Sequence, residues 1–491
     1  MTRACTFSRA FTALVATTLV GACADTHGIA PHSSGPRDVA GLHSETILAG
    51  AKAAPGPWPT LEWWKPYADA GLDALMDEAL KNNPSLAAAD ARLNKALAAR
   101  DLSRATLQPG FTTGISSTYE RLSKNFEVPP PYGGMWTFLN DARVTVSYEL
   151  DLWGKNHAAL ASAIGQAQAA EVDTFAAKLA LTTAIGHAYV QLAEAYELRD
   201  VAQATLDARL KMLDLVKSRV AAGMDSQLEV KQAEAAVPIA REDIATYGES
   251  IRLAQDQLAA LAGAGPDRGL SIPRPNFKLE QTVAGPRLPG NLPAELLGHR
   301  PDIVASRLRV EAASQSVTSA KAAFYPNVDL TAFAGLQSLG LSRFFDEGSV
   351  VAGIGPAVTL PVFNGNTLRS ALGSKAADYD AAVATYDQTL INALKEIADY
   401  LNSLHTVAEK SVQQAAAQVT AEAAYNLAVQ RYQAGLATYL QVLTAEEQVL
   451  AQRSLAADLR ARQVIFTVAL VGALGGGFES PAPGSPSPAV Q

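Results

Sequence analysis

The sequence contains two copies of one long segment. Asn83-Pro84-Ser85-Leu86 recurs as Arg300-Pro301-Asp302-Ile303, and Arg219-Val220-Ala221-Ala222-Gly223 recurs as Arg431-Tyr432-Gln433-Ala434-Gly435. Each copy is far longer than the 20 to 50 residues of a solenoid repeat, so the pattern indicates a duplicated domain. Any structure that one copy forms is therefore expected to be formed twice in the 491-residue chain.

The amino terminus has the pattern of an export signal. Arg3 and Arg9 give a basic start, an apolar segment runs from Phe11 to Val20, and Gly21-Ala22-Cys23 follows. The apolar segment is shorter than the roughly 20 residues that span a bilayer. Small residues before a cysteine resemble the bacterial lipobox, which implies removal of residues 1–22 and acylation of Cys23. An ordinary signal peptide with an incidental cysteine is the alternative.

Composition excludes several classes of protein. The sequence has two cysteines, Cys5 and Cys23, so neither a disulfide framework nor a cysteine-based metal site is expected. After the signal, no stretch holds 18 unbroken apolar residues, so any membrane span must be β. The net charge of -8 argues against nucleic acid as a partner.

Each copy predicts a short helix, two strands joined by a loop, a long helix, a tight turn and a returning helix. The long helices lack proline and would each extend about 100 Å at 1.5 Å per residue. Their apolar residues recur at spacings of three and four, which favours a coiled-coil wall over an ordinary antiparallel bundle. A short and a returning helix together approach the length of a long one, so we expect them to stack end to end beside it. The predicted helices are 85–107, 158–222 and 227–262 in the first copy, and 302–324, 368–434 and 439–473 in the second.

The predicted strands alternate apolar and polar residues. In one of them Ala142, Val144 and Val146 alternate with Arg143 and Thr145, which puts the apolar set on one face. Such strands fit a membrane barrel or a soluble sandwich. Four strands cannot close a barrel, because small closed barrels begin at about eight, so a barrel would have to be shared between chains. The strands are predicted at 111–122, 137–150, 328–338 and 350–361.

The remaining segments flank or connect the two copies, which we place at 58–264 and 294–477. Residues 23–57, rich in glycine, proline, alanine and serine, indicate a linker that follows the acylated cysteine. Residues 265–293 form a proline-rich connection between the copies. The tail at 478–491 has the composition of a disordered segment.

Several motifs, in this order within a duplicated frame, resemble the TolC-like outer-membrane efflux proteins, and most closely their OprM-like (NodT) lipoprotein branch. The resemblance covers about residues 58 to 477. The motifs are the lipobox, Trp58, Trp63-Trp64, Asn83-Pro84-Ser85-Leu86, Glu149-Leu150-Asp151-Leu152-Trp153-Gly154, Arg300-Pro301-Asp302, Pro361-Val362-Phe363-Asn364-Gly365 and Ala473-Leu474-Gly475-Gly476-Gly477.

The resemblance implies a mainly α fold with a membrane β-barrel portion. Three chains would form a homotrimer with a twelve-stranded outer-membrane barrel, four strands per chain, a long α-helical tunnel through the periplasm, and a mixed belt partway along it. The implied function is a passive channel of a tripartite efflux pump that exports small molecules, with no cofactor and no enzymatic activity. Its implied partners are a periplasmic membrane-fusion adaptor and an inner-membrane transporter of the resistance-nodulation-division class.

In this family, side chains near the tips of the long hairpins narrow the tunnel, and an adaptor docks there. The family's closing ring commonly has Asp after a Leu-Leu pair and Arg three positions later, where this chain has Thr444 and Glu447. A pairing of Arg431 with Glu447 across a helix interface is one interpretation, and a solvated Glu447 is the other. The motif match assigns Arg431, Tyr432, Thr444 and Glu447 to the gate, and Arg219, Gly223, Ser226, Leu228, Gly435 and Leu440 to the adaptor-contacting tips.

The sequence lacks the common motifs for catalysis and for metal binding. The sequence has no His-Glu-x-x-His, no Gly-x-Ser-x-Gly and no phosphate-binding glycine loop. Three alternatives to the efflux channel remain: the outer-membrane duct of a type I protein secretion system, a periplasmic coiled-coil adaptor, and a lipid-anchored periplasmic enzyme. Two hairpins and apolar-faced strands count against the adaptor, and the missing motifs count against the enzyme.

Overall fold

A computed structural model describes residues 26–38, 54–125, 131–276, 287–288, 292–361 and 364–480. The predictions for Cys23, for the signal segment and for the end of the tail lie outside these residues. The chain forms two compact units. The first contains Arg92–Ala170, Ser306–Tyr386 and the chain up to Pro36, and the second contains Arg37–Ala91, Glu171–Ala305 and the chain from Asp387 onward.

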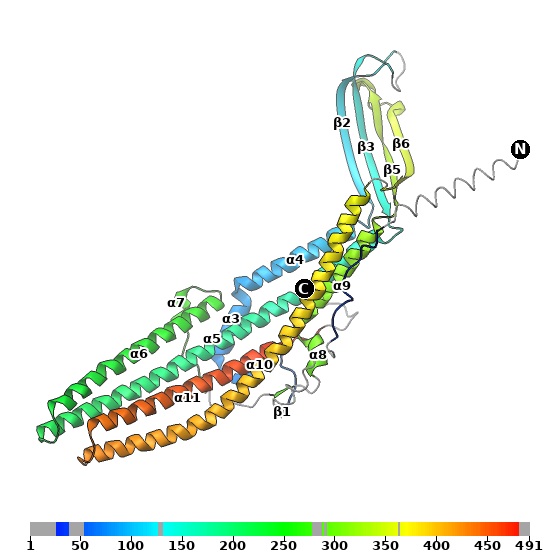
Figure 1. Cartoon of the computed structure of the whole chain (residues 1–491). Coiled ribbons are helices and arrows are strands. Elements are labelled where there is room, and N and C mark those ends of the chain that lie inside the picture. Colours follow the sequence, from blue (N-terminus) through cyan, green and yellow to red (C-terminus); the bar gives the residue numbers. More distant parts are fainter. Residues whose placement is uncertain are drawn as a thin grey trace. The chain divides into compact units, whose positions relative to one another are not determined.

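The first unit is built on a four-stranded antiparallel sheet (Figure 1). Its strands lie in the order β2 (Gly110–Arg121), β3 (Trp136–Leu150), β5 (Asn327–Leu339) and β6 (Val350–Thr359). The central pair β3–β5 joins the two sequence copies, in a register that runs from Leu139 opposite Leu339 to Leu150 opposite Val328. Because β6 is an edge strand, it accommodates Pro356, which cannot donate to a ladder.

One face of this sheet is apolar and exposed in the chain. Phe111 and Ile115 on β2 are 76% and 79% exposed, and Ile354 on β6 is 78% exposed. The alternation predicted from the sequence therefore places large apolar side chains on a surface that no other described part of this chain covers.

Helices of the first unit pack below the sheet around Phe324 and Leu372. These residues belong to α9 (Pro301–Ala322) with the turn after it, and to the start of α10 (Gly365–Gln433). Part of the segment predicted as a linker also packs here, since Ile29 contacts this cluster. The backbone N–H groups of His32 and Ser33 donate to the Asp380 carboxylate at 3.0 and 2.8 Å.

The second unit contains most of two long helical hairpins, whose long helices begin in the first unit. The first consists of α5 (Lys155–Ala221) and α6 (Gln227–Leu261), and the second of α10 and α11 (Tyr439–Ala473). The hairpins lie side by side, with Val216 and Val230 of one in a shared core with Tyr432 and Val442 of the other (Figure 1). At 67 and 69 residues, α5 and α10 correspond to about 100 Å each.

Short helices meet the returning helices end to end, as the lengths suggested. Asn83, just before α4 (Pro84–Ala105), donates from Nδ2 to the carbonyl of Leu261 at 2.7 Å. Its counterpart Arg300, before α9, donates from Nη1 to the carbonyl of Ala473 at 3.0 Å. The duplicated motif thus marks the same helix junction in both copies.

Several elements were not predicted from the sequence. The most important is α3 (Ala70–Asn82), which Asp69 caps by accepting from the N–H groups of Gly71 and Leu72. Its buried Met76 packs in the largest core cluster, together with Trp63 and Trp64. The other additional elements are η2 (Lys65–Tyr67), α7 (Pro266–Gly269), α8 (Leu292–His299), η3 (Leu341–Arg343), η4 (Glu347–Ser349) and the parallel pair β1 (Ala54–Pro55) and β4 (Arg287–Leu288).

Candidate functional site

The two hairpins end in the same type of turn. Gly223 and Gly435 adopt φ values of 71° and 75°, in the left-handed region that favours glycine. The N–H of the next residue, Met224 or Leu436, donates back to the carbonyl of Arg219 or Arg431. This is the geometry with which helices commonly end, so the turn is encoded by the duplicated Arg-x-x-x-Gly motif.

The returning helices start with equivalent capping boxes. Ser226 caps α6, and the side chain of Glu229 accepts from the Ser226 N–H at 2.9 Å. Thr438 caps α11 with Gln441 in the same reciprocal arrangement. These caps satisfy backbone donors at the first turn of each helix, which explains the position of Ser226 without any role in docking.

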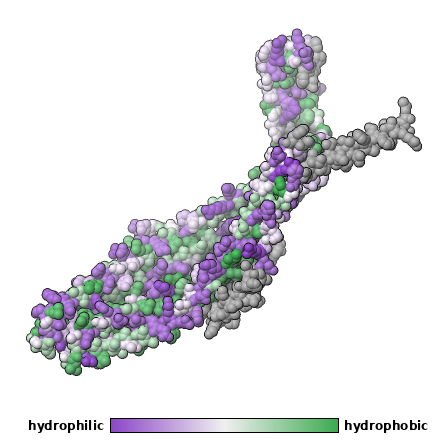
Figure 2. All heavy atoms as spheres, in the orientation of Figure 1, coloured by the Kyte–Doolittle hydropathy of each residue, from purple (hydrophilic) through white to green (hydrophobic). Residues whose placement is uncertain are grey.

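Apolar side chains are exposed at both hairpin ends. Met224 and Leu228 on the first hairpin are 59% and 62% exposed, and Leu436 and Leu440 on the second are 69% and 61% exposed. We call these four residues the apolar tip pairs. Figure 2 shows hydrophobic residues among hydrophilic ones at this end of the hairpins. Two equivalent surfaces of this kind suit a partner that contacts both hairpins in the same way.

A buried polar network ties the first hairpin to the second. Arg219 donates from Nε to Asp225 Oδ2 at 2.7 Å and from Nη2 to Asp225 Oδ1 at 3.2 Å. The hydroxyl of Tyr432 donates to Asp225 Oδ2 at 2.5 Å, and Arg219 also reaches the carbonyl of Gln433 at 3.2 Å. The Arg219 guanidinium lies 4.5 Å from the centre of the Tyr432 ring. We call Arg219, Asp225 and Tyr432 the tip network.

Charge and burial reinforce this network. The hydrogen bonds from Arg219 hold the pKa of Asp225 below its usual range. Burial, and then the Asp225 carboxylate, raise the pKa of Tyr432, so its hydroxyl stays a proton donor. Charge-assisted bonds of this kind are about twice as strong as neutral ones.

The network buries two of the residues that the sequence analysis assigned to the site. Arg219 was expected to contact an adaptor, but it is only 5% exposed because Asp225 and Tyr432 enclose it. Tyr432 was expected to line the gate, but it is fully buried between the hairpins of one chain. Asp225 was not singled out from the sequence, because an acidic residue in a polar turn has no distinctive pattern.

The other gate candidates lie on the surface of the second hairpin. Arg431, Thr444 and Glu447 are all exposed. Arg431 donates to the carbonyl of Leu436 at 3.5 Å, and among the described residues it forms no ion pair with Glu447 within this chain. The hydroxyl of Thr444 donates to the carbonyl of Leu440, one turn back along α11.

The neighbouring carboxylate, Glu446, makes a second tie between the hairpins. It accepts from Arg209 Nε on α5 at 3.2 Å, and Arg209 also donates to the carbonyl of Ala236 on α6 at 2.9 Å. Burial raises the pKa of Glu446 in spite of this ion pair. The pair was not predicted from the sequence, because nothing local to Glu446 distinguishes it from the adjoining Glu447.

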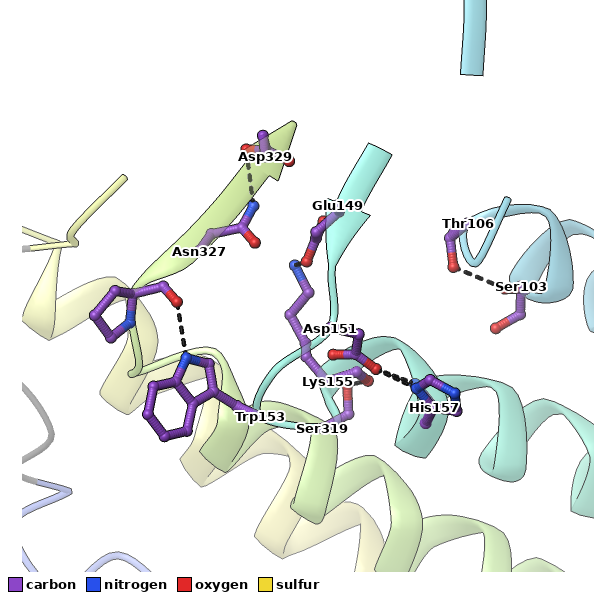
Figure 3. A network of polar contacts seen from close by, with 11 residues as sticks. Ser103, Thr106, Glu149, Asp151, Trp153, Lys155, His157, Ser319, Asn327 and Asp329 are labelled. Carbon is purple, nitrogen blue, oxygen red and sulfur yellow. Dashed lines mark hydrogen bonds and ion pairs between the residues drawn. The ribbon is translucent and has the colours of Figure 1, made fainter. Parts of the chain in front are cut away.

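The strand-to-helix junction of the first unit contains a further polar network (Figure 3). Asp151 follows β3 and accepts from the N–H and from Nδ1 of His157 at 2.8 and 2.6 Å. Lys155 pairs with Glu149 at 2.6 Å, and Trp153 donates from Nε1 to the carbonyl of Pro326 at 2.9 Å. This part of the Glu149-Leu150-Asp151-Leu152-Trp153-Gly154 motif therefore fixes how the sheet passes into α5.

The parts of the chain that the structure describes hold no group of three or more His, Cys, Asp or Glu side chains arranged to bind a metal ion. No helix within them has both the length and the apolar character needed to cross a membrane.

Known proteins match this chain over most of its length. The family model described as outer membrane efflux protein matches residues 75–264 and 292–476, once in each copy. MdtP of Shigella flexneri, a multidrug resistance outer membrane protein, is 32% identical over 95% of this chain and 96% of its own length. FusA of Burkholderia cepacia, a fusaric acid resistance protein, is 37% identical over 65% of this chain and 60% of its own. The crystal structure of the outer membrane protein VceC from Vibrio cholerae has a TM-score of 0.80 and 39% identity, over 86% of this chain and 100% of VceC.

Proposed function

This chain belongs to the outer membrane efflux protein family, and from that premise we propose that three copies form the passive outer-membrane duct of a tripartite pump. The observation that carries the proposal is the combination, in one chain, of a sheet with an exposed apolar face and two long hairpins with matching ends. A duct needs no catalytic group, because an energised inner-membrane transporter supplies the work.

Assembly into a trimer follows from the sheet. Strands β2 and β6 are its two edges, and each leaves a row of backbone hydrogen-bonding groups for a neighbour. Edges in contact with lipid must be paired, because the bilayer core offers no water to their N–H and C=O groups. Pairing of β6 in one chain with β2 in the next closes a barrel of twelve strands from three chains. Four strands alone are too few to close a barrel.

Anchoring at the outer membrane rests on the amino-terminal segment. Acylation of Cys23 would tether the chain three residues before Thr26, where the described part begins. From there the segment runs along α10, held by Asp380 through His32 and Ser33 and by an ion pair of 3.2 Å between Arg37 and Asp387. Replacement of Cys23 by serine should abolish incorporation of labelled palmitate, and unchanged labelling would contradict the assignment.

Cargo is expected to consist of small toxic molecules. The names of MdtP and FusA indicate multidrug and fusaric acid resistance for those proteins. We extend to this chain only the common class, small compounds that harm the cell, because a passive duct leaves substrate choice mainly to its transporter.

The apolar tip pairs are the proposed docking surface for the periplasmic adaptor. Leu228 and Leu440 occupy equivalent positions, so a hexameric or repeated adaptor end can contact each hairpin alike. Photo-crosslinking residues at these two positions should capture an adaptor, while the same residue at Leu253, which is 61% exposed but far along α6, should not.

The identity of the transporter that co-purifies with the crosslinked adaptor separates the two transport hypotheses. A resistance-nodulation-division transporter supports drug efflux. An ATP-driven exporter would instead indicate the outer duct of a type I protein secretion system.

A gate at the hairpin ends completes the proposal. The tip network holds the two hairpins of a chain together, and Arg431, Thr444 and Glu447 are exposed and free to face the duct or a neighbouring copy. Three uncharged Thr444 side chains would form a neutral ring, whereas three carboxylates would attract cations and repel anions. Thr444→Asp should therefore change channel conductance, and an unchanged conductance would remove Thr444 from the gate.

A further inference from the structure

A small cavity lies beside the point where the sheet passes into the helices of the first unit. Its volume is about 370 Å³, and it is lined by Thr26, Gly28, Ile29, Ala30, Lys321 and Tyr325. One wall is a tight turn in which the Ile29 N–H donates to the Thr26 carbonyl at 3.0 Å. His27 and Gly28, the central residues of that turn, have φ values of 51° and 72°, as in a type I′ turn.

The turn is fixed in place by packing. Ile29 contacts the buried cluster of Val317, Phe324 and Leu372, and His32 and Ser33 are held by Asp380. The wall of the cavity is therefore part of the folded unit, although the sequence suggested a linker at this point.

The cavity carries a positive charge without a partner. Lys321, in the last turn of α9, is exposed and makes no ion pair or hydrogen bond within the described chain. The nearby Lys155 differs, because Glu149 neutralises it at 2.6 Å. A lone ammonium group at the mouth of a cavity favours an anionic ligand.

Aromatic side chains border the same cavity. The ring of Tyr325 stacks on that of Trp153 with centroids 4.8 Å apart, and the two residues are 38% and 48% exposed. The Trp153 N–H is fixed on the Pro326 carbonyl (Figure 3). Exposed tryptophan and tyrosine side chains are typical of the boundary between a membrane and water.

The apolar face of the sheet begins next to these aromatic residues. Leu150, at the end of β3, precedes Trp153 by three residues, and Val328, at the start of β5, follows Tyr325 by three. Leu152, between Leu150 and Trp153, is 63% exposed. Acyl chains could lie on this face while a headgroup reaches the cavity.

We propose that this cavity binds the phosphate headgroup of an anionic phospholipid, with Lys321 supplying the charge and the Trp153–Tyr325 pair lying against the glycerol region. The inference rests on the proposed function, because it requires this end of the sheet to meet a bilayer. A bound lipid would fix the height of the duct in the membrane beside the acylated terminus.

Lysine-reactivity footprinting of the full chain tests this site. Purified trimers are placed in vesicles of phosphatidylglycerol or of phosphatidylcholine and treated with an amine-acetylating reagent, and modification is read by mass spectrometry at each lysine. Lys321 should react about fivefold more slowly in phosphatidylglycerol than in phosphatidylcholine vesicles. This is the protection expected when one ammonium group lies near an anionic headgroup. Lys95, an exposed lysine of α4, is the internal control and should react equally in both vesicles.

Native mass spectrometry gives a second readout that does not depend on reactivity. Trimers of Lys321→Gln should retain several-fold less phosphatidylglycerol than the unmodified protein, while Lys95→Gln trimers retain the same amount. Equal retention by all three proteins, or equal Lys321 reactivity in both lipids, would overturn the proposal. Protection by inorganic phosphate alone in phosphatidylcholine vesicles would show a free-anion site and would also overturn it.

Two controls separate this inference from the other proposals. Conductance in the same vesicles shows whether the duct is inserted, so a failed footprint in conducting vesicles rejects the lipid site alone. Cys23→Ser removes the chain's own acyl group. If protection of Lys321 disappears in that variant, the occupant is the protein's lipid anchor and the phospholipid site is rejected.

Discussion

Arg219 and Arg431 occupy equivalent positions in the two copies, yet their environments differ. Arg219 is buried on Asp225, while Arg431 is exposed and meets only a backbone carbonyl. In the second copy Ala437 stands where Asp225 stands in the first, and Val220 occupies the position equivalent to Tyr432. The duplicated arginine therefore forms this ion pair only in the first copy, where Asp225 is its acceptor.

This difference gives a matched pair of variants. Arg219→Ala should lower the free energy of unfolding by about 3 kcal/mol, because it leaves the largely enclosed Asp225 carboxylate without its counter-ion. Arg431→Ala should change it by less than about 0.5 kcal/mol, as is usual for exposed positions. Thermal denaturation of detergent-solubilised trimers measures both. Equal destabilisation by the two substitutions would contradict the assigned environments.

Glu194 on α5 predicts a pH dependence of stability. Burial, together with the nearby Asp458 and Glu197 carboxylates, raises its pKa from 4.5 to about 7 although Arg462 opposes the shift. Between these values the folded chain holds a proton that the unfolded chain has released. The contribution of Glu194 to stability is therefore lost as pH rises from about 4.5 to about 7, and is flat above that.

The corresponding measurement is the melting temperature of trimers at pH 5.5 and pH 8. Glu194→Gln should raise the melting temperature at pH 8 and reduce the difference between the two conditions. Glu242→Gln, at an exposed position of α6, serves as the control and should leave that difference unchanged. A pH dependence that is the same in all three proteins would show that Glu194 does not titrate in this range.

At the scale of elements, the helix junctions depend on two equivalent glycines. Gly263 has a φ of 78°, and a Cβ there would lie 2.5 Å from the carbonyl oxygen of Asn82. Gly475 has a φ of 89°, and its Cβ would overlap the carbonyl oxygen of His299. Both glycines let a returning helix end directly against the start of a short helix.

Gly263→Ala and Gly475→Ala should therefore prevent assembly or reduce the yield of folded trimer severely, because backbone atoms cannot move aside cheaply. Gly223→Ala is the control: its φ is also positive, but nothing lies within 4 Å of the added carbon. We expect it to cost only about 1 to 2 kcal/mol. Similar trimer yields for Gly263→Ala and Gly223→Ala would show that the junction tolerates displacement.

Helices were predictable from the sequence where the periodic pattern of apolar residues continued over many residues without interruption. The prediction for the last helix, 439–473, coincides with α11, and the predicted start at 158 lies three residues after the start of α5 at Lys155. In contrast, α3 lies in a segment with no repeat partner, and its helical character depends on packing of Met76 against Trp63 and Trp64. Local patterns do not contain that information.

The candidate site was less predictable for the same reason. Gly223 and Gly435 could be placed in turns, since a left-handed residue at a helix end favours glycine. The role of Asp225 depends on contact with Tyr432, more than 200 positions later in the chain. The role of Glu446 likewise depends on contact with Arg209, more than 200 positions earlier. A single sequence, read without an alignment, gives no signal for such pairs.

For the whole molecule, we propose a duct that three chains form and that the hairpin ends close. In this proposal the sheet meets the membrane and the hairpin ends meet the partners. The tip network connects the two hairpins of one chain at the end where closure is proposed. Loosening it should open the duct without disturbing the sheet.

Single-channel conductance in planar bilayers measures whether the tip network keeps the duct closed. Asp225→Ala removes the shared acceptor of Arg219 and Tyr432, and Glu242→Gln serves as a distant control. We predict low basal conductance for the unmodified trimer and for the control, and a several-fold higher conductance for Asp225→Ala. Inserted, folded Asp225→Ala trimers that conduct no better than the unmodified protein would contradict the account.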